Sequence, residues 1–166
     1  RAVDLTQQLL TFSRGGSPMR HPTQLADVIR ESAGFATSGS PVRLDVDLPD
    51  DLWTVHGDVG QLSRVVHNLV LNAVQAMPAG GVVRIRGENV SGDKECNGND
   101  PDGASAGDVV RLTIEDDGPG IPAALHDRVF DPFFTTRPEG TGLGLAVADS
   151  VIRRHGGRLS LVSGPG

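Results

Sequence analysis

Two glycine clusters bracket one segment of this chain and constrain its backbone more than any other feature. They are Asp116-Asp117-Gly118-Pro119-Gly120-Ile121 and Gly140-Thr141-Gly142-Leu143-Gly144-Leu145. Glycine tolerates positive φ and lets main-chain N–H groups approach a ligand closely. The apolar spacing after the second cluster predicts that it opens a helix, and a helix N-terminus attracts anions. The pattern predicts a nucleotide pocket with a movable lid, at about residues 122–141, between two glycine hinges.

Composition excludes several classes of protein. The 166 residues suffice for one domain with a real core, and no apolar run approaches the roughly eighteen residues that a membrane span needs. A net charge of −6 gives no basic surface for nucleic acid. The single cysteine, Cys96, excludes an internal disulfide and suits a reducing compartment, so we expect a cytoplasmic domain without membrane contact. Because Arg1 is not a natural start, we expect a fragment of a longer chain.

Helical periodicity appears in four segments. Residues 1–14 carry an apolar stripe and read either as the tail of a helix or as a frayed amphipathic end. A second helix is predicted to begin at Pro22-Thr23, with Thr23 as its cap and Gly34 as a weak point or end. A fourth helix follows the second glycine cluster and runs to about His155.

The third helix is the most informative one. It is predicted to run from Val59 to Met77, with Asp58 as its cap. Beside its apolar core stripe it carries a separate polar stripe, which consists of Gln61, Arg64, Asn68, Asn72 and Gln75.

Alternation of apolar and polar residues predicts strands at about 42–48, 52–56, 82–86, 109–115 and 158–162. The first two are expected to pair as a hairpin. Residues 88–108 are polar and lack periodicity, which predicts a surface insertion without chemistry. Strands and helices are segregated in places. This favours an α+β fold, a two-layer α/β sandwich with a mixed sheet of about five strands covered by three helices.

Asn68 and Asn72 lie one turn apart on the same helical face. Asparagine is a poor residue for a helix interior, so the pair suggests a site. Its side-chain carbonyl is a hard ligand that suits Mg²⁺, which takes most of its ligands from phosphates and water. Solvated asparagines would be the simpler interpretation if the chain lacked a glycine-rich anion cradle.

Asp116 ends a predicted strand immediately before the first glycine cluster. A carboxylate there can accept a hydrogen bond from the adenine amino group and would repel the carbonyl of guanine, so it can select the base. The alternative is a turn aspartate. No P-loop, kinase loop or metal-ligand spacing of histidine and cysteine occurs in the sequence.

Four segments resemble the N, G1, F and G2 boxes of sensor histidine kinases, in the order of that family. They are Asn68-Leu69-Val70-Leu71-Asn72-Ala73, Asp116-x-Gly118-x-Gly120-Ile121, Phe130-Asp131-Pro132-Phe133-Phe134 and Gly140-Thr141-Gly142-Leu143-Gly144-Leu145. One box alone is weakly specific, whereas four in order are strongly specific. The resemblance, to the nitrogen-regulation-like type, implies the Bergerat ATP-binding fold shared with the Hsp90, DNA gyrase and MutL group.

The resemblance also implies roles for individual residues. Asn72 would hold Mg²⁺, with Asn68 beside it near the phosphates of ATP, and both would serve catalysis. Asp116 would bind the adenine amino group. Arg137 would either contact a phosphate or remain a solvated lid charge. The base pocket would be lined by Gly118, Gly120 and Ile121, and the lid and helix start would close over the phosphates at Gly140, Thr141, Gly142, Leu143, Gly144 and Leu145.

The implied activity is transfer of the γ-phosphoryl group to a histidine on a separate dimerisation domain of the same protein. A response regulator would receive it next, and the parent protein would be a homodimer. Residues 1–16 would be the end of the dimerisation helix with its linker, and residues 17–166 the ATP-binding domain, with the family's final strand missing. His126 is followed by Asp, as a phosphoacceptor would be, but it lies in the lid segment.

Two other functions stay open, namely an ATPase clamp and a pseudokinase module that binds nucleotide or partner helices. The clamps resemble one another in carrying a glutamate four residues before the Mg²⁺ asparagine, where it activates water. Asn68 occupies that position here. An amide cannot accept the proton, so the sequence favours phosphotransfer over hydrolysis.

Overall fold

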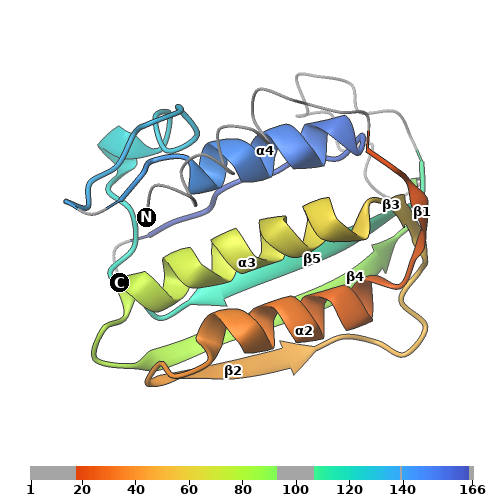
Figure 1. Cartoon of the computed structure of the whole chain (residues 1–166), viewed down its shortest axis with the longest axis horizontal. Helices are drawn as coiled ribbons and strands as arrows, with labels where there is room; N and C mark the ends of the chain where they lie inside the picture. Colours follow the sequence, from red (N-terminus) through yellow and green to blue (C-terminus); the bar gives the residue numbers. More distant parts are fainter. Residues whose placement is uncertain (1–17, 93–106, 139, 165–166) are drawn as a thin grey trace.

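The computed structural model describes residues 18–92, 107–138 and 140–164. The predicted helical tail at residues 1–14, the proposed linker through residue 16, and Cys96 lie outside these ranges. Within these ranges three helices cover a mixed sheet in two layers, which confirms the predicted α+β sandwich (Figure 1). The helices are α2 (Leu25–Thr37), α3 (Val59–Ala76) and α4 (Gly144–Arg154), and a short 3-10 turn, η2 (Ala123–Leu125), lies in the lid segment.

The strands that the structure describes form two sheets rather than one. The larger sheet has the order β2-β4-β5, with β2 (Val42–Asp47) parallel to β4 (Gly81–Val90) and β4 antiparallel to β5 (Val109–Asp116). The smaller sheet pairs β1 (His21–Thr23) with β3 (Val55–Gly57). The predicted hairpin between residues 42–48 and 52–56 is therefore wrong, because each segment pairs with a different partner.

The start of α2 differs from the prediction. Thr23 belongs to β1 and does not cap the helix; its buried hydroxyl donates a 3.1 Å hydrogen bond to the main-chain oxygen of Gly57. The helix begins at Leu25 and continues past Gly34 to Thr37. The hydroxyl is thus satisfied by the β1–β3 sheet, a partner that helical periodicity does not reveal.

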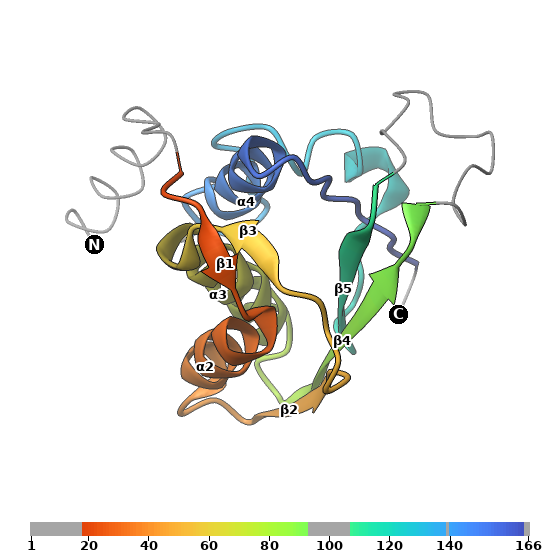
Figure 2. The same ribbon diagram turned by 90° about the vertical axis from the view of Figure 1, so that its right-hand side faces the viewer.

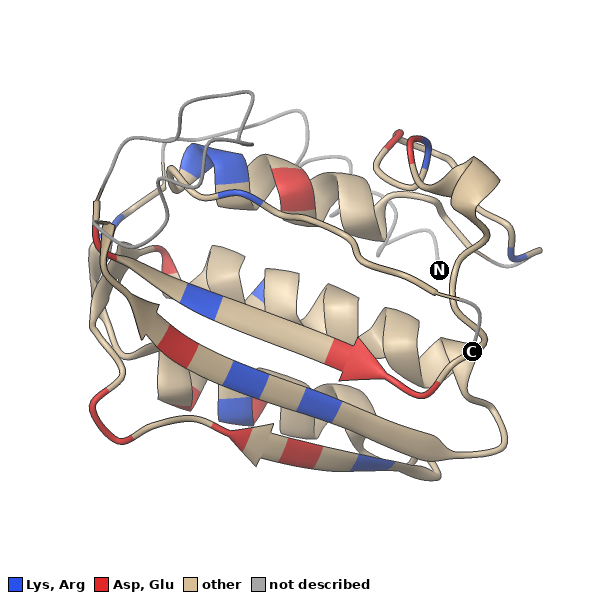
Figure 3. Ribbon diagram, turned by 180° about the vertical axis from the view of Figure 1, so that it is seen from behind, with Lys and Arg blue, Asp and Glu red and all other residues tan. Residues whose placement is uncertain are grey.

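Charge and burial separate the two faces of the larger sheet. Asp45, Arg84 and Glu115 are neighbours across β2, β4 and β5 and share one face of the sheet. Figure 3 views the sheet from the side away from the helices and shows charged positions along all three strands. The opposite face carries Val83 and Ile85, which are fully buried. Because side chains alternate along a strand, this arrangement directs the even-numbered residues of β5, Asp116 among them, toward the helices.

The buried apolar residues in the described part of the chain form two clusters that meet at α3. The larger cluster joins α2, α3 and the sheet through residues such as Ile29, Val70 and Ile85. The smaller cluster joins α3 to α4 through Val65, Leu143, Val147, Ala148 and Val151. Helix α3 therefore lies between α2 and α4 (Figure 2).

Two further predictions need correction. Strand β4 continues through Val90 and pairs with the start of β5, so residues 88–90 are not part of a surface insertion. Residues 158–162 were expected to form a strand, yet within the described part of the chain they pair with none. None of the described helices is long and apolar enough to cross a bilayer.

Candidate nucleotide-binding site

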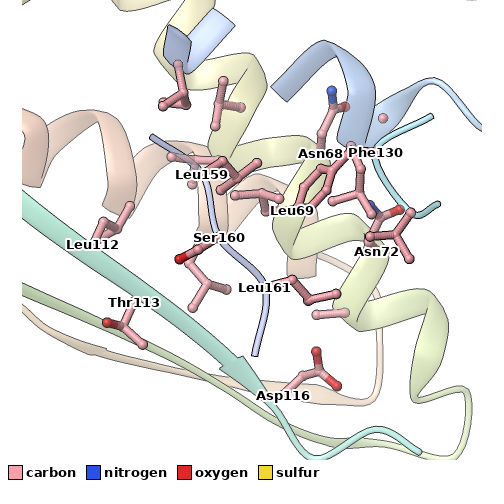
Figure 4. A pocket seen from close by; sticks show the side chains of 18 of the residues that line it. Asn68, Leu69, Asn72, Leu112, Thr113, Asp116, Phe130, Leu159, Ser160 and Leu161 are labelled. Carbon is pink, nitrogen blue, oxygen red and sulfur yellow. The ribbon is translucent and has the colours of Figure 1, made fainter. Parts of the chain in front are cut away.

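A groove runs between α3 and the end of β5, and the side chains singled out in the sequence converge on it. Asn68 and Asn72 reach it from α3, and Asp116 reaches it from the last residue of β5 (Figure 4). The helical spacing of the two asparagines and the strand alternation before Asp116 place all three side chains in one groove. Leu159 and Leu161 line the groove as well.

The carboxylate of Asp116 is fixed by the turn that follows it. Its Oδ1 accepts a 2.8 Å hydrogen bond from the main-chain N–H of Gly118. A Cβ at Gly118 would lie only 2.5 Å from that oxygen, so the turn requires glycine there. Asp116 is therefore held at the strand end with its carboxylate directed into the groove.

Asp117 fastens the same strand end from the other face. Its Oδ2 accepts from the N–H of Val82 at 3.1 Å, and its Oδ1 accepts from the Arg84 guanidinium at 2.6 Å. The Arg84 hydrogen bond and charge hold the pKa of Asp117 below its usual value, so this carboxylate stays ionised. The sequence prediction did not include Asp117, although two consecutive acids at a strand end were a visible signal.

The amide of Asn72 lies against the start of α4. A Cβ at Gly144, the first residue of α4, would lie 3.6 Å from the Asn72 Nδ2. Leu143 at the N-cap supplies no side-chain hydrogen bond, so its side chain does not occupy the first N–H groups of the helix. An anion at this point would meet both the positive end of the helix dipole and the amide.

The lid segment closes on the second glycine cluster at its base. The N–H of Phe133 donates a 2.9 Å hydrogen bond to the main-chain oxygen of Gly142. Both residues have positive φ, at 68° for Phe133 and 66° for Gly142. A Cβ at Gly142 would lie 2.6 Å from the Phe133 oxygen, so only glycine fits this contact. At the glycine cluster predicted to act as the second hinge, the backbones of Phe133 and Gly142 thus cross in close contact.

The first glycine cluster contacts the C-terminal segment and the lid. The N–H of Ile121 donates a 2.7 Å hydrogen bond to the Ser163 hydroxyl, and the Ile121 oxygen lies 2.9 Å from Nε2 of His126. Gly120 adopts a φ of 73°, which favours glycine. His126 thus has a structural contact at the start of the lid.

The structure brings nearly every predicted site residue to the groove. Leu143 is the exception, because its side chain is fully buried in the cluster between α3 and α4 and does not line the groove. Gln75 lines the groove and was noted only as part of a polar stripe. The predicted residues that do line it are Asn68, Asn72, Asp116, Gly118, Gly120, Ile121, Arg137, Gly140, Thr141, Gly142, Gly144 and Leu145.

Fold and groove together define an α+β nucleotide-binding domain. Residues 57–166 match the model of the histidine kinase-, DNA gyrase B- and HSP90-like ATPases, so the chain belongs to that family. The resemblance to sensor histidine kinases is thereby confirmed, because relatives that match almost the whole chain carry that name.

Two of these relatives set the scale of the similarity. The sensor kinase CckA of Brucella abortus (strain 2308) is 37% identical over 161 residues, which cover 95% of this chain and 17% of that protein. The sensory histidine kinase/phosphatase NtrB of Rhodobacter capsulatus is 35% identical over 169 residues, which cover 100% of this chain and 46% of that protein. The chain thus spans less than half the length of either relative.

Solved structures agree with the fold. The mycobacterial sensor histidine kinase MprB has a TM-score of 0.64 at 29% identity, over 83% of this chain and 81% of that one. Full-length ShkA in complex with AMPPNP has a TM-score of 0.72 at 23% identity, over 92% of this chain and 31% of that one. At that identity the second likeness concerns the fold alone.

Proposed function

We propose that this chain is the catalytic, ATP-binding domain of a two-component sensor histidine kinase. The observation that carries the proposal is the convergence of Asp116, Asn68, Asn72 and the N-terminus of α4 on one groove. Asp116, which can select a nucleobase, lies at one point of that groove. The N-terminus of α4, which suits phosphates, lies at another. A nucleoside triphosphate presents the complementary groups at its two ends.

Each part of the groove then has a role. Asp116 accepts a hydrogen bond from the adenine amino group, while the main chain at Gly118, Gly120 and Ile121 borders the base. The N-terminus of α4 and the second glycine cluster receive the phosphates. Arg137 lies at the base of the lid and supplies a positive charge to the phosphate end.

The residues present fit a magnesium ion. Among the described residues, no group of three or more His, Cys, Asp or Glu side chains is arranged to hold a metal by itself. Mg²⁺ bound to a nucleotide needs only one or two protein ligands, and the Asn72 amide oxygen is suited to that role, with Asn68 beside it. When bound, the ion supplies neutralising charge to the phosphate oxygens.

Phosphotransfer fits the groove better than hydrolysis does. Of the described residues that border it, the carboxylates are Glu115 and Asp116, both at the end of β5. The Glu115 side chain lies on the other face of the sheet, and neither carboxylate lies beside Asn72. No such acid is therefore placed to activate water at the position of Asn68. An incoming histidine needs no such base, because its own imidazole nitrogen forms the bond to the γ-phosphorus while the bond to ADP breaks.

The acceptor histidine would belong to a separate dimerisation domain of the same protein, with residues 1–16 as its end and linker and residues 17–166 as the ATP-binding domain. A response regulator would then accept the phosphoryl group. The parent protein would act as a homodimer, with this domain in the cytoplasm.

Phosphotransfer to the dimerisation domain tests the proposal. The chain is mixed with that domain and with γ-labelled ATP and Mg²⁺, and full-length parent protein serves as the positive control. We expect acid-labile label on a histidine of the dimerisation domain and little free phosphate. Label on the full-length protein alone would contradict the assignment, and sustained phosphate release by the isolated chain would favour an ATPase clamp.

A further inference from the structure

Gln75 belongs to the polar stripe on α3, and the proposed function gives it no role. It lies in the last turn of α3, close to one helical turn after Asn72, and its side chain is exposed and borders the groove. An exposed glutamine at a helix end is ordinarily solvated. This one instead makes a hydrogen bond to a residue 62 positions away in the sequence, in the lid.

That residue is Arg137, whose guanidinium is held at two points. One terminal nitrogen donates a 2.6 Å hydrogen bond to Oε1 of Gln75, and the other donates a 3.0 Å hydrogen bond to the main-chain oxygen of Asn72. The last turn of α3 has no basic residue of its own. Arg137 therefore brings a positive charge to the negative end of the α3 dipole, which favours this position.

The main chain at Arg137 is also fixed. Its N–H donates a 3.1 Å hydrogen bond to the Thr135 hydroxyl oxygen, and its carbonyl oxygen accepts a 3.1 Å hydrogen bond from the N–H of Gly140. Backbone and guanidinium are thus held separately, the first by the lid and the second by α3. The side chain spans the space between them.

Asn72 links this arrangement to the phosphate cradle. Its carbonyl oxygen accepts from Arg137, while its side-chain amide lies against Gly144 at the start of α4. Asn72 therefore contacts the Arg137 guanidinium through its main chain and lies against the N-terminus of α4 through its side-chain amide. A guanidinium has five N–H donors, and the two hydrogen bonds to α3 leave others to donate to phosphate oxygens.

We propose that Gln75 is a positioning residue that holds the Arg137 guanidinium beside the terminal phosphate of the nucleotide, so that the site prefers a triphosphate to a diphosphate. The proposal rests on the proposed function. Gln75 acts through Arg137 and does not touch the ligand itself. Fixing a long side chain before the ligand arrives reduces the conformational entropy lost on binding.

Titration of the chain with Mg-ATP and Mg-ADP tests this role. Gln75→Met keeps the length of the side chain and removes the acceptor. We expect the ATP affinity of this variant to fall about fivefold, which corresponds to roughly 1 kcal/mol, with the ADP affinity within about twofold of wild type. Gln24→Met is the matched control. Gln24 donates a hydrogen bond to Thr54 near the start of α2, so its substitution should leave the affinities for ATP and ADP unchanged.

A double-mutant cycle separates positioning from a merely structural effect. Arg137→Leu should reproduce the selective loss of ATP affinity, and adding Gln75→Met to it should cause no further loss. The proposal would be overturned if Gln75→Met lost ATP and ADP affinity equally, kept both affinities unchanged or bound ATP more tightly. Additive losses of ATP affinity in the double variant would overturn it too. If the wild-type chain binds ATP and ADP equally, only the positioning role of Gln75 is overturned. If it binds neither nucleotide, the proposed function is overturned as well.

Discussion

On the proposed function, Asp116 would give the groove its preference for adenine. Its carboxylate is held by the Gly118 N–H and faces the groove, while the adjacent carboxylate of Asp117 is occupied by Arg84 and Val82. Two neighbouring acids therefore have different tasks because strand alternation directs them to opposite faces.

The substitution Asp116→Asn should weaken adenine binding. The amide retains similar volume but loses the charge-assisted hydrogen bond, so we expect ATP affinity to fall at least about tenfold and the preference for ATP over GTP to shrink. Calorimetric titration with both nucleotides measures the change. Asp117→Asn is the neighbouring control and should keep the base preference; an Asp116→Asn variant with wild-type affinity would remove this residue from base recognition.

The first turn of α3 depends on Asp58. Its Oδ1 accepts a 3.0 Å hydrogen bond from the N–H of Gln61, and its Oδ2 accepts a 3.1 Å hydrogen bond from the N–H of Met19. Desolvation opposes ionisation, but these main-chain donors outweigh it and hold the pKa of Asp58 below its usual value. The predicted helix cap is thus confirmed, and it also anchors the segment that precedes β1.

Because its folded-state pKa is lowered, Asp58 contributes stability above its unfolded pKa, about 3.9, and loses that contribution as pH falls through the folded value. Asp58→Ala should cost about 1 kcal/mol of unfolding free energy at pH 6. The difference in unfolding free energy between Asp58→Ala and wild type should become smaller at about pH 3. Urea unfolding at both values measures it, and a difference independent of pH would assign the effect to something other than the carboxylate.

At the scale of elements, the sequence predicted the helices better than their partners. The apolar stripe and the Asp58 cap fix α3 within one residue, since both signals are local. Alternation predicted β2 but not its pairing with β4, because strand partners are set by how the helices pack on the sheet. The groove could be predicted because its residues form short motifs, whereas the hydrogen bond between Gln75 and Arg137 joins distant segments.

The crossing of the lid base and α4 is a second feature at this scale. Gly142→Ala would force a left-handed conformation on alanine and place its Cβ 2.6 Å from the Phe133 oxygen. We expect a loss of about 1–2 kcal/mol in stability and at least about tenfold in ATP affinity, because the lid base must move. Thermal unfolding and nucleotide titration measure the two effects.

Gly34→Ala provides the matched substitution in α2. No atom lies within 4 Å of a Cβ built there, so alanine should raise the unfolding free energy by about 0.5–1 kcal/mol and leave nucleotide binding unchanged. Identical behaviour of the two glycine variants would mean that the crossing at Gly142 is not a steric constraint on the site.

At the scale of the whole molecule, the described residues pack into two hydrophobic cores that share α3. The larger core joins the sheet, α2 and α3, and the smaller one holds α4, with Leu143 from the second glycine cluster buried inside it. Both the two asparagines and the start of α4 are consequently placed by α3. The site should respond to loss of packing in the smaller core more strongly than to an equal loss in the larger one.

Two valine substitutions of similar burial test this difference. Val147 on α4 is 6% exposed and belongs to the smaller core, and Val42 on β2 is 7% exposed and belongs to the larger one. Neither residue lines the groove. Substitution of either valine by alanine should lower the unfolding free energy by about 2 kcal/mol, because it removes two buried methyl groups.

Only Val147→Ala should also weaken ATP binding, since it loosens α4, whose N-terminus is proposed to receive the phosphates and is preceded by the buried Leu143. Urea unfolding gives the stability of each variant, and titration with Mg-ATP under native conditions gives its affinity. Equal affinity losses in both variants would mean that the site follows global stability. Full affinity in a destabilised Val147→Ala variant would mean that the position of α4 does not depend on the smaller core.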